Sequence, residues 1–353
     1  MDHTIAVFPG GRPLLHVVID TEEEFDWEKP FQRDCASVHT IDAQWRAQEI
    51  FDAFGIQPTY VVDYPVATTT SSIAVLKSFL AAGRCQIGTH LHPWVNPPFS
   101  EVVSASTSYP GNLAPALERE KIKALHDAIS SAFSNKPVIY KAGRYGIGPN
   151  TAKILGSLGY LVDTSVVPHT DYSHDGGPDF HNFPDKPFWL DRLGGILEIP
   201  MTRGFSGFRT GQRGAMLYRK LQASRGGRAK LSVLSRVRLF ERGTLTPEGV
   251  DPAAQRRLTR SLIRDGHKVF TLSYHSPSLE PGHTPYVRNQ KHLDKFLDSI
   301  KATLEFFFEY LCAEATTPVA LWDLAFRQTR PGLRRDPEAS LVDRRPQEPI
   351  LPQ

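Results

Sequence analysis

The stretch LLHVVIDTEEEFDW (14–27) places a run of acidic residues directly behind a run of apolar ones. Its first half, LLHVVID (14–20), is apolar and rich in β-branched residues, which is typical of a buried parallel strand. The acids that follow are Asp20, Glu22, Glu23, Glu24 and Asp26. Carboxylates repel one another at short range, so the stretch predicts either a solvated loop or a cation site. Asp20 and Glu22 have i, i+2 spacing at a strand end, so their side chains share one face.

Outward from this strand, short apolar strands alternate with helical segments. We expect strands at 14–20, 58–63, 84–90, 137–143, 160–165, 267–275 and 318–324, and helices at 41–55, 71–83, 113–133, 149–158 and 290–311. Repeated strand–helix units favour a parallel sheet with helices outside it. Asp20, His90, Asp163 and His275 each end one of these strands. Barrels of this type carry the active site at that edge, so the pattern favours a barrel over an open sheet.

The segment QIGTHLHPW (86–94) brings His90 and His92 to the end of the third expected strand. Their i, i+2 spacing lets both imidazoles point at one centre, although two surface histidines on a turn would have the same spacing. Two imidazoles with a carboxylate are a common ligand set for zinc or another divalent transition metal. Trp94 is either a wall of a sugar-binding groove or a packed side chain.

Two further segments supply candidate polar groups. YKAGRYGIG, at 140–148, predicts a tight turn with exposed backbone amides, and Lys141 or Arg144 can pair with Asp20 there and keep it ionised. The strand that ends at His275 places an imidazole where it can protonate a leaving group.

As an ordered set from Leu14 to Ala325, these motifs resemble the polysaccharide deacetylase superfamily (NodB homology, carbohydrate esterase 4-like), and within it the WalW-type branch. The set comprises the acid-rich strand end, H-x-H-P, the K-A-G-R-x-G turn, a D-T-S strand end and the late strand ending in histidine. The resemblance implies a distorted (β/α)7 barrel with a divalent metal, usually zinc. Such enzymes remove acetyl groups from N-acetylated sugars.

The resemblance also implies roles for individual residues. Asp20 would be the general base, with Lys141 or Arg144 as its cationic partner and a turn amide for the oxyanion. His275 would be the general acid. The metal ligands would be His90, His92 and Glu22, with Glu23 and Asp26 as alternatives to Glu22. The residues expected to contact the sugar are Trp94, Tyr145, Asp163 and His283.

The sequence departs from the family pattern at three points. The usual adjacent Asp-Asp pair is D-T-E here, the two histidines are two apart instead of four, and Lys141 stands where arginine is common. The leading hypothesis is a metal-dependent deacetylase that acts on N-acetylated sugars of a surface polysaccharide or its precursor. The alternatives are a carbohydrate-binding pseudoenzyme and a metal-dependent hydrolase of another non-peptide C–N bond.

Composition agrees with a globular enzyme. The chain has 353 residues, 40% hydrophobic and 22% charged, which excludes a coiled coil, a collagen-like repeat and wholesale disorder. A net charge of +3 makes nucleic acid an unexpected partner. Three cysteines form no disulfide framework, and neither a signal peptide nor a membrane span is evident, so we expect a cytoplasmic protein without stable membrane insertion. The oligomeric state is left open.

The expected organisation is one barrel domain, 14–333, behind an N-terminal extension, 1–13. A basic helical region is inserted at 203–265, and a proline-rich, charged tail, 334–353, is expected to be disordered. Residues 203–242 contain eleven Lys and Arg against a single acid, Glu241. This run is either a solvated surface or a basic lid that attracts an anionic substrate or a membrane surface.

Overall fold

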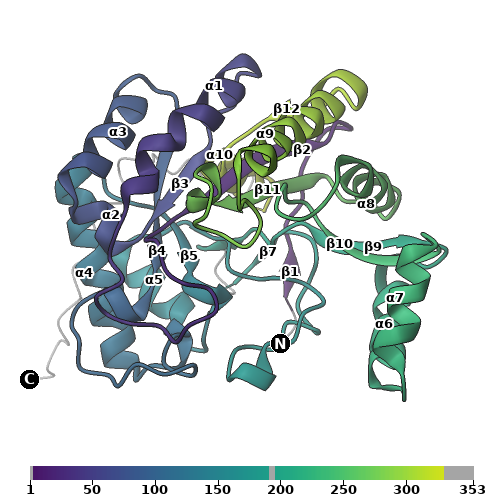
Figure 1. The fold of residues 1–353 in the computed structure, drawn as a ribbon, viewed down its shortest axis with the longest axis horizontal. Helices are drawn as coiled ribbons and strands as arrows, with labels where there is room; N and C mark the ends of the chain where they lie inside the picture. The colour runs from purple at the N-terminus through teal and green to yellow at the C-terminus, as the bar shows by residue number, and fades with distance from the viewer. Residues whose placement is uncertain (1–2, 191–194, 330–353) are drawn as a thin grey trace, which may run out of the picture.

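A computed structural model describes residues 3–190 and 195–329, and the expected disordered tail lies outside the described residues. A curled sheet runs through the molecule, and helices cover its outer face (Figure 1). Among the described residues, the sheet contains seven consecutive parallel strands. In spatial order they are β8 (Leu197–Glu198), β6 (Val162–Asp163), β5 (Ile139–Ala142), β4 (Gln86–Leu91), β3 (Thr59–Val62), β2 (Leu14–Thr21) and β11 (Val269–His275). The distorted (β/α)7 barrel expected from the sequence is confirmed.

Three short strands extend this sheet. β7 (Phe188–Trp189) runs antiparallel to β8, and β1 (Thr4–Ile5), from the N-terminal extension, runs antiparallel to β7. β12 (Glu314–Ala315) pairs with the start of β2.

The barrel is closed irregularly between β8 and β11. The N–H of Thr271 donates to the hydroxyl of Thr202 at 2.7 Å, and the Thr271 hydroxyl donates to the carbonyl of Pro200 at 3.2 Å. These bonds take the place of a ladder between the two strands, and they start just before the segment that the sequence marks as inserted.

The helices around the sheet are α1 (Trp45–Ala53), α2 (Tyr64–Thr68), α3 (Thr70–Ala81), α4 (Pro115–Phe133), α5 (Thr151–Leu158), α8 (Pro252–Arg264), α9 (Gln290–Glu305) and α10 (Pro318–Thr329). A π-helical turn, Phe306–Tyr310, continues α9. Short 3₁₀ turns lie at His39–Gln44, Pro93–Val95, Pro110–Asn112, Gly143–Tyr145, Ser173–Asp175 and Ser276–Leu279.

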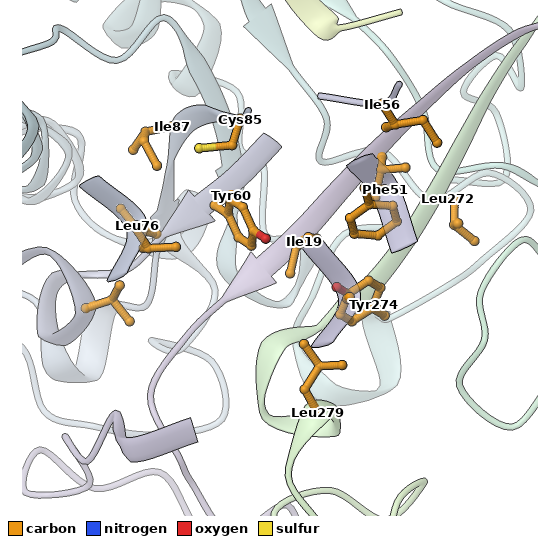
Figure 2. Packing of buried hydrophobic residues seen from close by; sticks show 14 of the residues in the cluster. Ile19, Phe51, Ile56, Tyr60, Leu76, Cys85, Ile87, Leu272, Tyr274 and Leu279 are labelled. Carbon is orange, nitrogen blue, oxygen red and sulfur yellow. The ribbon is translucent and has the colours of Figure 1, made fainter. Parts of the chain in front are cut away.

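Helix and strand side chains meet in one large core. Phe51 of α1 packs beside Ile19 of β2 and Tyr274 of β11, and none of the three is more than 1% exposed (Figure 2). Burying an aromatic or branched side chain of this size contributes roughly 1.5–3 kcal/mol, so this cluster holds the first helix against the first and last parallel strands.

The segment 318–324, expected as a strand, is the helix α10 instead. Its buried residues include Leu321, Trp322, Ala325 and Phe326, whose spacing of one, three and four residues fits a helix face and not a strand. Pro318 suits the first turn of a helix, where its missing N–H has no partner to lose.

The basic segment contains two different parts. β9 (Arg203–Gly207) and β10 (Phe240–Thr244) form an antiparallel ribbon whose connection carries α6 (Gly211–Ala223) and α7 (Gly227–Arg236). We call residues 203–244 the basic hairpin, and its helices project from the body (Figure 1). α8 belongs to the barrel, because Leu258 and Leu262 lie in the main core. The expected insertion, 203–265, thus includes one helix of the barrel.

The tight packing of adjacent strands can be tested by a substitution at Gly88 in β4. A Cβ atom at Gly88 would lie 2.9 Å from Val61 Cγ1 and 3.0 Å from the carbonyl oxygen of Ile139. Gly88→Ala should therefore lower the free energy of unfolding by about 1–3 kcal/mol. At the helical control site Gly156, a Cβ would have its nearest neighbour 3.8 Å away. Gly156→Ala should be neutral or stabilise by up to about 1 kcal/mol in urea denaturation. Equal effects of the two changes would contradict this description.

Candidate active site

The carboxyl ends of neighbouring strands bring the predicted polar residues together. Parallel pairing sets His275 of β11 beside Asp20 of β2, and His90 of β4 beside Lys141 of β5. Strand register thus gathers residues that are far apart in the sequence at one edge of the sheet.

Asp20 and Lys141 form a buried ion pair. Lys141 Nζ lies 2.6 and 2.8 Å from the two Asp20 carboxylate oxygens, and 3.3 Å from the hydroxyl of Ser273. Burial by itself would raise the pKa of Asp20, but the charge of Lys141, helped by His90 and His275, holds it below its usual value. Asp20 is therefore ionised at neutral pH.

Glu22, His90 and His92 form a second buried group beside this pair. Glu22 Oε2 lies 3.4 Å from His90 Nε2 and 3.5 Å from His92 Nε2. The other carboxylate oxygen, Oε1, is buried and has no hydrogen-bond partner. Burial raises the pKa of Glu22 to about 7 and lowers that of His92 to about 4, so the burial that keeps His92 neutral also disfavours the charged form of Glu22.

Hydrogen bonds on the far side of each imidazole fix its orientation. His90 Nδ1 lies 3.2 Å from the carbonyl oxygen of Lys141, and His92 Nδ1 lies 2.7 Å from Glu23 Oε2. Trp94 Nε1 donates to the other oxygen of Glu23 at 2.7 Å. Both Nε2 atoms are thereby left facing Glu22. Outer hydrogen bonds of this kind are how proteins orient histidines that bind metals.

The three candidate acids lie in different surroundings. Glu23 is engaged by His92 and Trp94, and its backbone N–H donates to Asp63 Oδ2 at 2.6 Å. Asp26 lies in the exposed loop and pairs with Lys29 at 3.0 Å. Of the three, Glu22 is the acid that directs an oxygen, Oε2, at both histidines, and its other oxygen, Oε1, is buried without a hydrogen-bond partner. Two imidazoles and a carboxylate that lacks a partner fit a divalent cation.

His275 is held by an acid that the sequence did not suggest. Glu248 Oε2 lies 2.8 Å from His275 Nδ1, and Glu248 Oε1 accepts the backbone N–H of His275 at 3.1 Å. His275 Nε2 lies 3.7 Å from Asp20 Oδ2. Burial opposes a charge on the imidazole, but Glu248, Glu22 and Asp20 together outweigh it and raise its pKa to about 10.

The turn after β5 has a strained backbone. Arg144 and Tyr145 both have positive φ angles, of 53° and 61°. A Cβ atom at Gly143 would lie 2.5 Å from His92 Cδ2, so only glycine leaves room for that imidazole. Strain of this kind in a non-glycine residue is common at functional sites.

No protein-family model matches the sequence, and no curated protein matches it. Solved structures do. A candidate polysaccharide deacetylase from Mycobacterium smegmatis is 16% identical over 99% of each chain, with a TM-score of 0.50. Puue allantoinase is 15% identical over 92% of this chain and 94% of its own, also with a TM-score of 0.50. The chain has the NodB-homology fold of the polysaccharide deacetylases. Assignment to the WalW-type branch stays a prediction.

Within this NodB-homology fold, several predicted residues lie apart from the central cluster. Arg144 pairs with Asp175 and stacks on Tyr109, with its guanidinium carbon 4.1 Å from the ring centre. Of the two cations predicted to pair with Asp20, Lys141 is therefore the one that does so. Trp94 is only 1% exposed, and it packs against the ring of His92 instead of forming an open wall.

Asp163 is fully buried, accepts a hydrogen bond from Ser165 and pairs in register with Glu198, so it cannot contact a bound sugar. Burial raises the pKa of Asp163 to about 7. Tyr145 is half-buried and stacks on Tyr172, while His283 lies at the rim, 3.6 Å from Glu24.

Glu248 and Asp63, which contact His275 and Glu23, were not predicted from the sequence. Nor was Trp27, whose ring meets that of His275 edge-on at 4.9 Å. The signal that could have identified Trp27 is the presence of aromatic residues within the acidic stretch at 20–27. Nothing in the sequence around Glu248 marks it, since it follows the basic hairpin in an irregular loop.

Glu248→Gln should lower the pKa of His275, because it removes the negative charge of the Glu248 carboxylate beside Nδ1. If protonated His275 is needed for turnover, the alkaline limb of the pH–rate profile should move to lower pH by about 1–3 units, the usual effect of an opposite charge at this distance. The control Glu49→Gln changes an exposed carboxylate on α1 and should leave the profile unchanged. An alkaline limb that stays in place in Glu248→Gln would exclude this role.

Proposed function

We propose that this protein is a metal-dependent deacetylase acting on an N-acetylated sugar. The observation that carries the proposal is the buried group of Glu22, His90 and His92 beside an ionised Asp20 and a protonated His275. An ion site next to one proton acceptor and one proton donor is what amide hydrolysis requires. The shared fold with polysaccharide deacetylases supports a carbohydrate substrate.

His90, His92 and Glu22 would hold the metal, zinc being the expected ion. A divalent metal there polarises the acetyl carbonyl and favours ionisation of the attacking water. Glu23 would orient His92 without binding the metal itself. The partnerless Oε1 of Glu22 supports this assignment over Glu23 or Asp26.

Asp20 would accept the proton of the attacking water. Its ion pair with Lys141 keeps the carboxylate charged and fixes both oxygens, one of which lies 3.7 Å from His275 Nε2. His275, kept protonated by Glu248, would donate a proton to the amine that leaves. The base and the acid therefore have opposite charge states at neutral pH, as the two proton transfers require.

The strained turn would stabilise charge that develops on the acetyl oxygen. A turn that directs successive backbone N–H groups toward one side is a common way to bind an oxyanion. Trp27 lies beside His275, and the ring centre of Tyr286 is 5.9 Å from that of Trp27. Both aromatic side chains would contact the sugar. His283 would complete the rim.

A second candidate is a hydrolase of another non-peptide C–N bond. Puue allantoinase matches as well by TM-score as the candidate deacetylase does, so the fold does not choose between an acetamide and a cyclic ureide. A surface polysaccharide or its precursor as the substrate, and a cytoplasmic location, also stay proposals.

Acetate release from a panel of N-acetylated glycans decides between these candidates, with allantoin as the alternative substrate. We expect acetate, and we expect it to disappear after chelation and return when zinc is added. Allantoin cleavage without acetate release would favour the second candidate. Metal binding without either activity would favour a carbohydrate-binding pseudoenzyme.

His90→Ala and His92→Ala should each abolish stoichiometric metal binding, measured by elemental analysis of the purified protein, and activity with it. Glu22→Gln should also lose metal, because it removes the carboxylate charge that faces both histidines. Glu23→Gln should weaken metal affinity by only about 10–100-fold, the usual effect of changing a residue that orients a ligand. Full metal occupancy in Glu22→Gln, with loss in Glu23→Gln, would move the ligand role to Glu23.

Asp20→Asn should keep most of the metal and lose about 10²- to 10⁴-fold in kcat, the range for a positioned base. The amide keeps the shape of the side chain but cannot accept the proton. A variant that retains wild-type kcat would show that another group is the base, and one that loses the metal would make Asp20 a ligand.

A further inference from the structure

A pocket of about 490 Å³ lies where the basic hairpin meets the barrel. Four arginines line it, namely Arg238 of the hairpin and Arg257, Arg260 and Arg264 of α8, and no described acidic side chain does. Like charges gathered in one concave site raise the local positive potential and attract anions.

Few of these charges are balanced by the protein itself. Arg257 pairs with Glu241 at 3.1 Å. Arg260 lies over the rings of Phe306 and Tyr310, at 5.3 and 5.1 Å, which holds its guanidinium without neutralising it. Within the described residues, Arg238 and Arg264 have no ion-pair partner. The pocket thus offers a guanidinium cluster suited to phosphate.

Exposed apolar side chains lie directly beside these arginines. Gly207 and Arg238 line the pocket, and their chain neighbours Phe208, Val237 and Leu239 are 58%, 55% and 54% exposed. The Phe208 N–H donates to the Leu239 carbonyl at 3.0 Å, so these residues sit on the same end of the β9–β10 ribbon. We call this exposed set of chain neighbours of the pocket lining, Phe208, Val237 and Leu239, the apolar rim.

The helices of the hairpin also carry cationic side chains next to exposed apolar ones. On α6, exposed Met216 shares a face with Arg213 and Lys220, and on α7, exposed Val233 shares one with Lys230. Five of the twelve exposed large hydrophobic residues found in the described ranges fall between 208 and 239. This concentration marks the hairpin as an interaction surface.

The pocket lies away from the candidate active site. Arg264 precedes the first residue of β11, and Leu311, also in the pocket wall, precedes β12, which pairs with the first residues of β2. Asp20 and His275 occupy the opposite ends of those strands. At roughly 3.3 Å per residue, the length of β11 separates the two sites by about 20 Å.

We propose that the basic hairpin and its arginine pocket dock the protein on an anionic phospholipid surface. The arginines would bind lipid phosphates, and Phe208, Val237 and Leu239 would enter the interface beside them, together with Val233, which lies one helical turn before Val237. A soluble phosphate compound would account for the arginines but not for the exposed apolar rim. Surface binding combines cationic groups with apolar side chains in this way. None of the helices described here has the length and apolar character to cross a membrane.

The test is co-sedimentation of the full chain with vesicles of phosphatidylcholine, either alone or mixed with phosphatidylglycerol. We expect binding only to the mixed vesicles. Arg238→Gln, Arg260→Gln and Arg264→Gln combined should lower the partition coefficient about 100-fold, since each charge near an anionic surface contributes about fivefold. Val233→Ser with Val237→Ser should lower it about tenfold, because both side chains lose their transfer into the interface.

The matched charge control combines Lys77→Gln, Lys136→Gln and Lys153→Gln, which removes three exposed charges outside the hairpin. The apolar control combines Val7→Ser with Val102→Ser, two exposed valines elsewhere. Both controls should bind as the wild type does.

Failure to bind mixed vesicles, or equal losses in variants and controls, would overturn the proposal. Calorimetric binding of inorganic phosphate that disappears in the arginine variant, with no effect of the valine variant on vesicle binding, would assign the pocket to a soluble phosphate. Activity on a soluble substrate should be unchanged in every variant, so the outcome is independent of the proposed catalytic function.

Discussion

The ion pair between Lys141 and Asp20 is the constraint around which the candidate active site is organised. Neither side chain is more than 4% exposed, and the ammonium group bridges β5, β2 and, through Ser273, β11. A buried charge left without its partner costs roughly 3–5 kcal/mol, so these strands must keep their relative positions for the barrel to be stable. The same pair keeps Asp20 ionised beside the imidazoles. Stability and the state of the proton acceptor thus depend on one contact.

The sequence predicts this arrangement where the signal is local. The acidic end of β2 and the two histidines of β4 are each visible in a short stretch of sequence. The alternation of strands and helices is visible because each element has its own local pattern of apolar residues. The sequence could not distinguish Glu22 from Glu23 as the metal ligand, because both follow the strand end. Their orientation depends on the contact of Glu23 with Asp63. Glu248 was not predicted for a similar reason, since the tertiary fold is what brings it into contact with His275.

Two errors show the limits of pattern reading at strand ends and in short apolar runs. Asp163 ends a strand just as His90 does, but β8 lies beside it and places Glu198 against it, so it is enclosed instead of forming part of the rim. The run at 318–324 is short enough to fit a strand, and the helical spacing of its buried residues becomes evident only with Ala325 and Phe326, which lie beyond the run. A sequence shows which residues are apolar, but not what covers them.

The pairing of β2 with β11 has a consequence for biosynthesis. Along this parallel pair, contacting residues such as His16 and Thr271 are 255 positions apart in the chain. Contacts at such long separations form slowly, because a large loop must close before they are gained. A ribosome that has not yet released the last third of the chain exposes Asp20 without His275. The nascent polypeptide therefore lacks the proposed acid–base pair until β11, which carries His275, has left the ribosome.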